Sequence, residues 1–251
     1  LMFIVAGGIY CFRNFVVPFI RRKFRVSEVA QQTHDTFTLT FEPEDKKPIY
    51  RNPGQYMFLK LIRPGRNSEL HPFTISASPI RSDILQATIK KSGNFTNTIA
   101  ETKEGDTGKI EAPFGRFSYV YDNPSKFIFI AGGVGITPVM SMIRSLRDTG
   151  DQREAVLIYG NKTEGDIIFR EEIDKLPENF RTVYVLSRAD GDYEGEKGYI
   201  TKEIINKYAG DILKEGHVYL CGPPVMMSKI VEALGELDVV DERVHYERFT
   251  I

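Results

Sequence analysis

The sequence predicts a chain of two units: an antiparallel β-barrel, followed by an α/β unit built on a parallel sheet. A length of 251 residues accommodates two small domains of ordinary size. Up to about residue 123, short apolar runs alternate with turns that contain Pro and Gly, which is typical of a small antiparallel barrel. Beyond that point, continuous apolar runs alternate with helical stretches, which is typical of a parallel sheet covered on both faces.

The barrel is predicted over residues 24–123. Short apolar runs separated by turn residues give its strands, at residues 25–30, 36–41, 56–61, 73–77, 84–89 and 109–111. A single helix is expected in this half, at residues 97–104.

The α/β unit is predicted over residues 124–251, after a boundary at residues 121–125. Its four buried strands and its extended tail are expected at residues 127–131, 155–159, 182–186, 218–221 and 244–249. The helices that follow the four strands are expected at residues 138–147, 166–175, 201–207 and 225–234.

Residues 1–23 form an apolar segment that ends in a cluster of basic residues. The unbroken apolar run, residues 1–12, is shorter than the roughly 20 residues that span a bilayer. Five basic side chains and no acidic one lie within residues 1–25, and Lys and Arg accumulate on the cytoplasmic side of a membrane span. We therefore expect the end of a transmembrane helix with a basic juxtamembrane segment, and a location at the cytoplasmic face of the cell membrane. The alternative is a soluble amphipathic helix, although Pro18 argues against a regular one.

Charge and cysteine content exclude several classes of function. The formal net charge is −1, with 33 Lys and Arg against 34 Asp and Glu, whereas a nucleic-acid binder usually carries a basic excess. We therefore expect no nucleic-acid partner. The two cysteines, Cys11 and Cys221, are too few for a disulfide framework, a four-cysteine zinc site or a four-cysteine iron–sulfur cluster. No metal site is expected.

A glycine-rich turn follows the first strand of the α/β unit and opens its first helix. It contains Gly132, Gly133 and Gly135, with Thr137 expected as the helix N-cap and Pro138 as the first helical residue. Glycines let the backbone approach a dinucleotide pyrophosphate, and a helix N-terminus offers free N–H groups. The turn therefore predicts a nucleotide site. Because Pro138 replaces the third glycine of the usual G-x-G-x-x-G pattern, a turn that serves packing alone is the alternative.

The end of the third apolar run bears on the choice of nucleotide. An NAD-preferring site usually has an acidic residue at a strand end to bind the ribose hydroxyls, whereas this run ends in Ser187 and Arg188. A hydroxyl and a guanidinium suit a 2′-phosphate, so NADPH is expected. Asp190 works against this preference, which leaves NADH open.

Five motifs in register resemble the ferredoxin–NADP reductase superfamily, in which a flavin-binding barrel precedes a pyridine-nucleotide domain. The resemblance covers about residues 24–251 and includes the glycine-rich turn. The other motifs are His71-Pro72-Phe73-Thr74, Gly93-Asn94-Phe95-Thr96, Cys221-Gly222-Pro223-Pro224 and the tail His245-Tyr246-Glu247-Arg248-Phe249. The resemblance implies an NAD(P)H:flavin oxidoreductase.

The resemblance implies a set of flavin-binding residues. Phe73 would pack against the isoalloxazine ring, and the Thr74 hydroxyl would bond near N5, which alternates between acceptor and donor. His71 would lie near the pyrophosphate, where a neutral imidazole contributes only a hydrogen bond. The further members of the set are Pro72, Lys90, Gly93, Asn94, Phe95 and Thr96. The choice of FAD over FMN comes from the family alone.

The resemblance also implies residues on the nicotinamide side. The turn that would face the nicotinamide comprises Cys221, Gly222 and Pro223. Cys221 would act as a steering group and not as a nucleophile, because the nearest histidine in sequence, His217, lies about 13 Å away along the strand. Glu247 would polarise the flavin or relay protons beside it. Phe249 would stack over the flavin where the nicotinamide docks, so Phe249→Ala should change hydride transfer while flavin binding survives.

Within the superfamily, the sequence resembles the dehydrogenase domain of the NADPH oxidase and ferric reductase branch, and a bacterial NADPH oxidase in particular. The His71-Pro72-Phe73-Thr74 motif, the apolar start with its basic cluster and the lack of an iron–sulfur domain carry this resemblance. It implies that electrons pass from NADPH through FAD to a haem in the chain's own upstream membrane domain, and then to oxygen, which becomes superoxide. The alternatives are a ferric reductase and a soluble ferredoxin or flavodoxin reductase.

Overall fold

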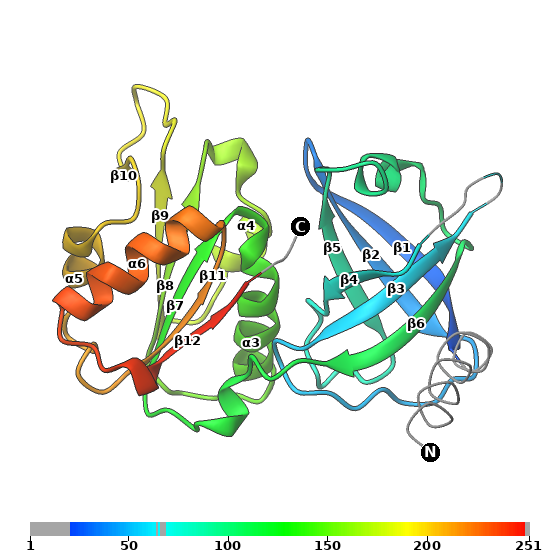
Figure 1. Ribbon diagram of the computed structural model, residues 1–251, viewed down its shortest axis with the longest axis horizontal. Coiled ribbons are helices and arrows are strands. Elements are labelled where there is room, and N and C mark those ends of the chain that lie inside the picture. The colour runs from blue at the N-terminus through cyan, green and yellow to red at the C-terminus, as the bar shows by residue number, and fades with distance from the viewer. Residues whose placement is uncertain (1–20, 64, 66–68, 249–251) are drawn as a thin grey trace, which may run out of the picture.

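The computed structural model describes residues 21–63, 65 and 69–248 (Figure 1). An antiparallel sheet from the first half of the chain and a parallel sheet with helices from the second half lie side by side. This is the fold class that the sequence predicts. The end of a transmembrane helix and its basic segment are expected over residues 1–23. Residues 1–20 lie outside the described residues, whereas Arg22 and Lys23 form the start of the barrel strand β1. Within the part of the chain that is described, no helix is long and apolar enough to cross a bilayer.

The first half forms a six-stranded antiparallel sheet in the order β4-β3-β6-β1-β2-β5. Its strands are β1 (Arg22–Thr33), β2 (Thr36–Pro43), β3 (Tyr56–Ile62), β4 (His71–Thr74), β5 (Leu85–Lys90) and β6 (Thr107–Phe114). An isolated bridge between Ile75 and Ala87 joins the chain just beyond β4 to β5 and closes the sheet into a barrel.

Alternation along the strands builds the core of the barrel. On β3, Met57, Leu59 and Leu61 are fully buried, while the residues between them are partly exposed, so one side of the strand faces inward. Phe24 and Val26 of β1 point into the same apolar cluster. Their removal from water is the dominant favourable contribution to folding.

The strand expected at residues 73–77 begins and ends earlier than the hydrophobic pattern predicts. β4 comprises the His71-Pro72-Phe73-Thr74 motif itself. The register with β3 sets these limits, because Tyr56 lies opposite Thr74 and Leu59 opposite His71.

The helix expected at residues 97–104 is a short 3-10 helix, η2 (Thr96–Glu101). Arg63 donates to the carbonyl of Thr98 (2.5 Å), which is the acceptor that an α-helix would offer to the N–H group of Thr102. That N–H group bonds instead to the carbonyl of Ile99 (3.1 Å). The competition from Arg63 therefore favours the tighter helix.

The second half forms a six-stranded parallel sheet in the order β10-β9-β8-β7-β11-β12. Its strands are β7 (Phe127–Gly132), β8 (Ala155–Asn161), β9 (Phe180–Leu186), β10 (Glu196–Lys197), β11 (His217–Cys221) and β12 (Val244–Glu247). Every residue of β7 is buried, as expected for a strand covered on both faces. β10 was not predicted, because two charged residues at a sheet edge carry no hydrophobic pattern.

Helices cover both faces of the parallel sheet (Figure 1). α3 (Ile136–Asp148) and α4 (Arg170–Ile173) pack on one face, and α5 (Lys202–Ala209) and α6 (Pro224–Glu236) pack on the other. Short 3-10 helices connect the elements: η3 (Tyr119–Tyr121), η4 (Gly133–Gly135), η5 (Glu164–Asp166) and η6 (Asp241–Arg243).

The helix expected at residues 166–175 is reduced to the single turn α4. Phe169, immediately before it, has a left-handed backbone with φ of 61°. A left-handed residue interrupts a right-handed helix. Its side chain is buried in the core beneath α3, so burial of the apolar residues overrides the helical pattern here.

α3 lies between the parallel sheet and the barrel and joins the two halves (Figure 1). Two of its buried polar residues, Ser141 and Arg144, bond to the barrel. The Ser141 hydroxyl donates to the carbonyl of Ala77 (3.1 Å). Arg144 donates to the carbonyl of Ser76 (2.7 Å) and to Oε1 of Gln86 (3.3 Å). The helix that begins at the glycine-rich turn is thereby held against the barrel.

Candidate active site

The glycine-rich turn lies where the strand order of the parallel sheet reverses. β7 has β8 on one side and β11 on the other, and open α/β sheets bind ligands at the carboxyl ends of the strands at such a point. η4 follows β7, and the turn with Cys221, Gly222 and Pro223 follows β11. Two motifs that are about 90 residues apart in the sequence therefore lie beside each other.

The three glycines of the turn serve different purposes. A Cβ atom on Gly135 would collide with the carbonyl of Cys221, and one on Gly132 would overlap the side chain of Met226. Gly135 therefore requires glycine, because the obstructing atoms are backbone, whereas at Gly132 the flexible end of Met226 and the ring of Pro223 would have to move. Gly133 has a left-handed backbone with φ of 51°, and a Cβ there would meet no described atom within 4 Å. Its backbone therefore faces open space that a ligand can occupy.

The helix after the turn begins earlier than the sequence predicts. η4 runs directly into α3, and Gly135 holds the cap position of α3. The expectation of Thr137 as N-cap is therefore wrong: its hydroxyl donates back to the carbonyl of Val134 (3.0 Å). Pro138 is the third residue of α3, not the first. The N–H group of Ile136, the first residue of α3, bonds to the carbonyls of Gly133 and Val134. No described side chain caps η4, so the N–H groups at the start of η4 are the ones available to an anion.

Ser187 and Arg188 lie at the carboxyl end of β9, two strands from the glycine-rich turn. Their N–H groups donate to the carbonyls of Asn161 (3.0 Å) and Lys162 (2.7 Å) at the end of β8, which fixes the backbone. The side chain of Arg188 is exposed and bonds to no described residue. Because neighbouring strands lie about 4.8 Å apart, the backbone of Arg188 lies about 10 Å from the turn, a separation that one dinucleotide can bridge.

Thr74 combines burial with an unused hydroxyl. It ends β4 and is 9% exposed, and its hydroxyl bonds to none of the residues that the structure describes. The hydroxyl oxygen is not among the buried side-chain atoms without a partner, so water or a ligand can reach it. The hydroxyl therefore fits the role of bonding to a flavin nitrogen.

Aromatic contacts join the β4 motif to the predicted phosphate loop. The ring of His71 stacks on that of Phe95, with centroids 4.3 Å apart and an interplanar angle of 18°. Phe73 lies 6.2 Å from the same ring, and Pro72 is exposed. Residues about 20 positions apart in the sequence thus form one surface of the barrel.

Thr96 closes the predicted phosphate loop. Its hydroxyl accepts hydrogen bonds from the N–H groups of Ser92 and Gly93, both 2.9 Å long, and donates to the carbonyl of Gly93 (3.2 Å). The loop therefore uses this hydroxyl itself. The N–H groups of Asn94 and Phe95 have no acceptor within the described part of the chain, and they are the donors left for a phosphate.

Lys90 is already paired. Its ammonium lies 3.1 Å from Asp35. Burial opposes the ionisation of Asp35, but its hydrogen bonds with Lys90 and nearby threonines hold its pKa below the usual value. A flavin phosphate would have to share Lys90 with this carboxylate.

Cys221 and Glu247 lie opposite each other on β11 and β12. Cys221 is fully buried, and burial, with a smaller effect of Glu247, raises the pKa of its thiol. A neutral thiol is a poor nucleophile, in agreement with a steering role. Burial also raises the pKa of Glu247, whose carboxyl bonds to no described residue, so this group can hold a proton near neutral pH more readily than an ordinary glutamate.

Phe249 lies outside the described residues. Its expected stacking over the flavin stays a prediction from the sequence.

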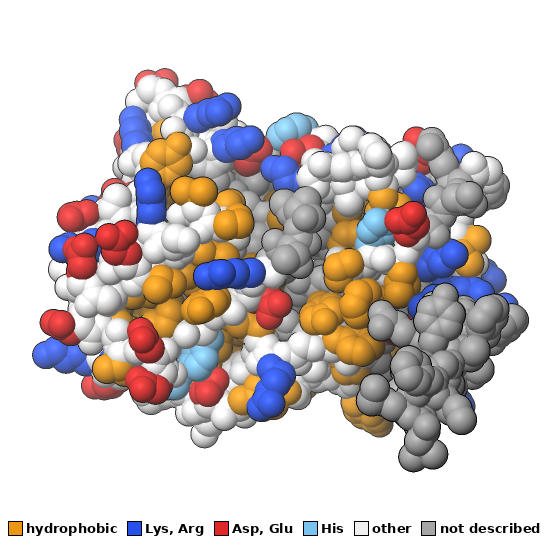
Figure 2. All heavy atoms as spheres, in the orientation of Figure 1, with side chains coloured by type: hydrophobic (Ala, Val, Ile, Leu, Met, Phe, Trp, Pro, Cys, Tyr) orange, Lys and Arg blue, Asp and Glu red, His pale blue; other side chains and the backbone are white. Residues whose placement is uncertain are grey.

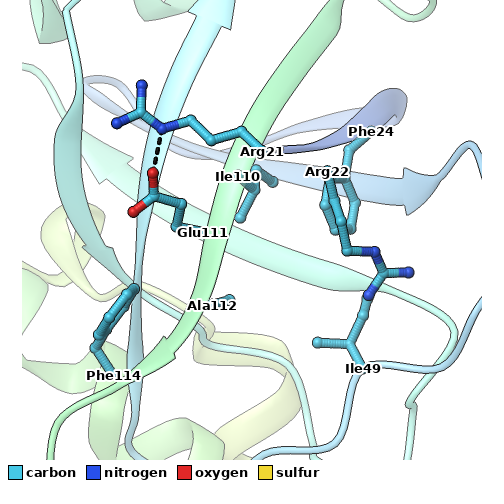
Figure 3. A pocket seen from close by; sticks show the side chains of 8 residues that line it. All are labelled: Arg21, Arg22, Phe24, Ile49, Ile110, Glu111, Ala112 and Phe114. Carbon is cyan, nitrogen blue, oxygen red and sulfur yellow. Dashed lines mark hydrogen bonds and ion pairs between the residues drawn. The ribbon is translucent and has the colours of Figure 1, made fainter. Parts of the chain in front are cut away.

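Apolar side chains gather on both sides of the junction between the two halves on the face that Figure 2 shows. A separate cavity of about 330 Å³ lies between the start of β1 and the end of β6 (Figure 3). It is lined by Arg21, Arg22, Phe24, Ile49, Ile110, Glu111, Ala112 and Phe114. No predicted site residue lines this cavity, and we do not assign a cofactor to it.

The sequence pattern missed two buried polar side chains near the site. Asn161 ends β8 beside the glycine-rich turn and is 8% exposed, and neither polar atom of its side chain has a hydrogen-bond partner among the described residues. A polar residue directly after a continuous apolar strand is the signal that points to it. Arg144, the residue of α3 that bonds to the barrel, is signalled by a basic residue within the apolar stretch of a helix.

Comparison with known proteins identifies two families of domain in the chain. Residues 21–129 match an FAD-binding domain, and residues 129–232 match an oxidoreductase NAD-binding domain. NADH-cytochrome b5 reductase 1 of Candida glabrata is 30% identical over 223 residues, covering 83% of this chain and 76% of that protein. The reductase component of propane 2-monooxygenase from Mycolicibacterium smegmatis is 30% identical over 245 residues, covering 93% and 69%.

Solved structures agree with the fold. The FAD/NAD-binding domain of nitric oxide dioxygenase from Vibrio cholerae superimposes with a TM-score of 0.81 at 23% identity, covering 91% of this chain and 98% of that one. The cytochrome b5 reductase domain of Ulva prolifera nitrate reductase gives 0.78 at 21% identity, covering 92% and 98%.

A flavin-type barrel joined to a nucleotide-binding parallel sheet defines a pyridine-nucleotide-dependent flavin oxidoreductase. The chain belongs to the ferredoxin–NADP reductase superfamily, with FAD as cofactor and a reduced pyridine nucleotide as substrate. The unused Thr74 hydroxyl, the free N–H groups of Asn94 and Phe95, and the open backbone at Gly133 fit these two groups.

Proposed function

We propose that the chain is a reductase that passes electrons from a reduced pyridine nucleotide through FAD to a separate one-electron acceptor, foremost a haem protein. The observation that carries this proposal is the contact between α3 and the barrel. Ser141 and Arg144 bond to the carbonyls of Ala77 and Ser76, which lie three and two residues after the candidate flavin residue Thr74. The nucleotide turn and the flavin motif are thereby held in one fixed arrangement, as hydride transfer requires.

The barrel residues would bind and orient the flavin. FAD, when bound, accepts a hydride and can release its two electrons one at a time. Thr74 would offer its hydroxyl to N5, and Phe73 would cover part of the ring. The N–H groups of Asn94 and Phe95 would bind a phosphate, while His71, already stacked on Phe95, would hold the loop in place.

The second half would bind the nucleotide. The uncapped start of η4 would hold the pyrophosphate, and the free guanidinium of Arg188 would bind the 2′-phosphate of NADPH. We therefore propose NADPH as the preferred donor. Relatives whose names specify NADH make NADH the alternative. Glu247, whose pKa is raised by burial, would hold a proton beside the nicotinamide, and Cys221 would limit the position of the ring.

The relatives favour a separate redox protein as acceptor. Among them are an NADH-cytochrome b5 reductase and the reductase component of a monooxygenase. Both names describe enzymes that deliver electrons to another protein or component. A soluble reductase of this kind is the function that we favour.

The second candidate is the dehydrogenase domain of an NADPH oxidase or ferric reductase. The His71-Pro72-Phe73-Thr74 motif on β4 and the basic start of β1 favour it. In this case the acceptor would be a haem in an upstream membrane domain, and the chain would act at the cytoplasmic face of the cell membrane with oxygen or ferric iron as the final acceptor.

Acceptor assays separate these candidates. The purified chain, reconstituted with FAD, is mixed with NADPH or NADH and, in turn, with a soluble b-type cytochrome, ferric citrate or oxygen alone. We expect rapid reduction of the cytochrome and slow reaction with oxygen. If the intact gene product in membranes forms superoxide while the isolated chain reduces no soluble haem protein faster than it reduces oxygen, the oxidase alternative replaces our proposal.

A further inference from the structure

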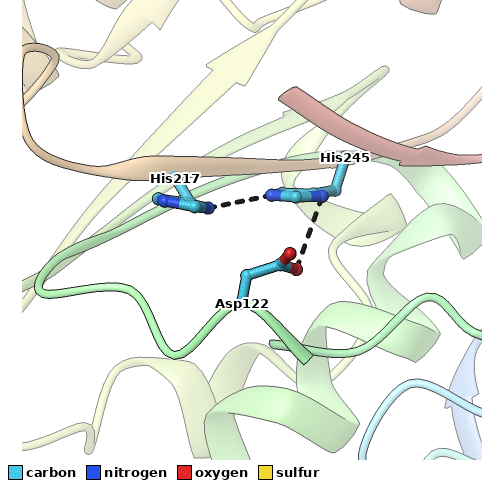
Figure 4. Close-up of side chains that lie close together, drawn as sticks. All are labelled: Asp122, His217 and His245. Carbon is cyan, nitrogen blue, oxygen red and sulfur yellow. Dashed lines mark hydrogen bonds and ion pairs between the residues drawn. The ribbon is translucent and has the colours of Figure 1, made fainter. Parts of the chain in front are cut away.

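Two histidines and an aspartate meet at the end of the parallel sheet that lies opposite the nucleotide turn (Figure 4). His217 is the first residue of β11, and His245 is the second residue of the adjacent β12. Asp122 comes from the connection between η3 and β7, which links the barrel to the parallel sheet. Since β11 ends at Cys221, the cluster lies about 13 Å along the strand from the nicotinamide-side turn.

The side chains of this cluster converge through their ligand atoms. Nδ1 of His217 lies 2.9 Å from Nε2 of His245, and Nδ1 of His245 lies 3.6 Å from Oδ2 of Asp122. One nitrogen or oxygen atom from each residue lies within 4.8 Å of the others. In Figure 4 the two imidazole rings point edge to edge, with the carboxylate below His245.

A neighbouring tyrosine holds one ring of the cluster in place. The ring of Tyr219 stacks on His245, with centroids 4.8 Å apart and an interplanar angle of 17°. The Tyr219 hydroxyl is buried without a hydrogen-bond partner among the described residues. The stacking contact supports one face of the His245 ring.

We propose that His217, His245 and Asp122 form a binding site for a divalent transition-metal ion of the zinc type. His217 Nδ1 and His245 Nε2 are the direct ligands, water completes the coordination, and Asp122 supports His245 from the other side of its ring. This site is independent of the flavin and nucleotide sites.

The donor set suits this ion. Imidazole nitrogens bind Zn²⁺ at 2.0–2.1 Å, so two of them in a tetrahedral site lie about 3.3 Å apart. The two nitrogens are now 2.9 Å apart in nearly parallel rings, with an interplanar angle of 9°. Binding therefore requires both rings to turn until their lone pairs point at one ion. A carboxylate facing the other ring nitrogen is the usual partner of a metal-bound histidine. It favours the tautomer with the proton on Nδ1 of His245, which leaves Nε2 free to coordinate. On binding, the Nδ1 proton of His217 moves to its Nε2.

Metal binding at this position would fasten the inter-domain connection to the sheet. The bound ion joins His217 of β11 to His245 of β12. Asp122 belongs to the connection between the two halves and faces the other ring nitrogen of His245, so it ties the connection to the site indirectly. The folded form alone assembles the ligands, and ligands that bind only the folded form stabilise it.

The test is Zn²⁺ titration of the full chain, purified without a histidine tag and stripped with EDTA, in competition with a fluorescent chelator. His245→Phe keeps a ring on Tyr219 but removes both nitrogens. His34→Gln is the matched control, because His34 also faces an aspartate, Asp35 (3.6 Å), but has no second histidine. Co²⁺ absorption then reports the ligand type, since thiolate coordination gives a charge-transfer band.

We expect one Zn²⁺ per chain, loss of binding in His245→Phe and unchanged binding in His34→Gln. Asp122→Asn, at an exposed position, should weaken binding at least tenfold, and the melting temperature should rise with Zn²⁺ only in chains that bind it. Binding that survives His245→Phe, a thiolate band with Co²⁺, or no binding by the unmodified chain at millimolar Zn²⁺ would overturn the proposal. If His245→Phe fails to fold, Asp122→Asn replaces it as the test, and an unchanged Zn²⁺ affinity in that variant would overturn the proposal.

Discussion

Replacement of Arg144 by Met should destabilise the protein through the contact between its two halves. Arg144 is 9% exposed and bonds on one side to the barrel and on the other to Glu172, with Nη2 2.5 Å and Nε 2.9 Å from the carboxylate. Its guanidinium also lies 4.5 Å from the ring centroid of Phe169. Methionine keeps most of the stem but removes every one of these polar contacts.

The magnitude follows from what the substitution leaves behind. Breaking a buried ion pair by removing one partner costs about 3–5 kcal/mol. Glu172 keeps one partner, since Nη1 of Arg147 lies 2.6 Å from its carboxylate, so we expect the lower limit, about 3 kcal/mol. Arg147→Met is the matched control. Its side chain is 37% exposed against 11% for Arg144, and pairs of that kind contribute about 1 kcal/mol or less.

Urea unfolding of the two variants and the unmodified chain measures these costs. With a slope of about 3 kcal/mol per molar for a chain of this size, Arg144→Met should lower the midpoint by about 1 M. Arg147→Met should lower it by about 0.3 M. If Arg144→Met costs no more than Arg147→Met, the inter-domain role of Arg144 is refuted.

The same variants predict a change in acid stability. Burial opposes ionisation of Glu172, but its bonds with Arg144 and Arg147 outweigh burial and hold its pKa below the usual value. The pKa of Glu172 is lower in the folded protein than in the unfolded chain, where it is about 4.3. Its ionised form therefore stabilises the fold above about pH 4.3, and this stabilisation is lost as the pH falls through the pKa of the folded state. The loss between pH 5 and pH 3 should therefore be smaller in Arg144→Met, and an equal loss would contradict the assignment.

Three further substitutions test the site. Gly133→Ala should cost about 1–2 kcal/mol of stability for the left-handed backbone and should weaken nucleotide binding at least tenfold in a titration, because its methyl group enters the open space. Gly135→Ala should cost more stability than Gly133→Ala, measured without nucleotide, because its methyl group meets the Cys221 carbonyl. Thr74→Val should keep FAD bound but slow flavin reduction in stopped-flow measurements, and Thr74→Ser should reduce at the rate of the unmodified chain. Equal rates in both variants and the unmodified chain would show that the Thr74 hydroxyl has no role in flavin reduction. Arg188→Gln should lower kcat/KM for NADPH by about 10- to 100-fold, because it removes a charged hydrogen bond to the 2′-phosphate. The kcat/KM for NADH should not change. An equal loss for both nucleotides would show that Arg188 has a structural role only.

Hydrophobic pattern was sufficient to predict most of the fold. The run at residues 127–131 became β7 because a strand buried on both faces must be continuously apolar. Alternation predicted β3 and its inward-facing residues. Local pattern failed where distant groups decide the structure: Arg63 favours a 3-10 helix at η2, and burial of Phe169 limits α4 to one turn.

The site was predictable only where a motif is contiguous. The sequence placed Gly133 and Thr74 in candidate sites, and the superfamily that these motifs predict is confirmed. The sequence could not show that Gly135 serves packing while Gly133 faces open space, because this difference depends on how closely Cys221 of β11 approaches each of them. The meeting of His217 with His245 depends on strand order. Neither is encoded in local spacing, because both arise from contacts across the sheet.

The most direct test of the account is anaerobic reduction of the FAD-loaded chain in a stopped-flow instrument. On mixing with NADPH, the flavin absorbance should bleach with a rate that saturates with nucleotide, and Gly133→Ala should shift the half-saturating concentration upward at least tenfold. NADH should react with lower kcat/KM. Flavin that stays oxidised with both nucleotides would contradict the central claim that the nucleotide turn and the flavin motif form one hydride-transfer site.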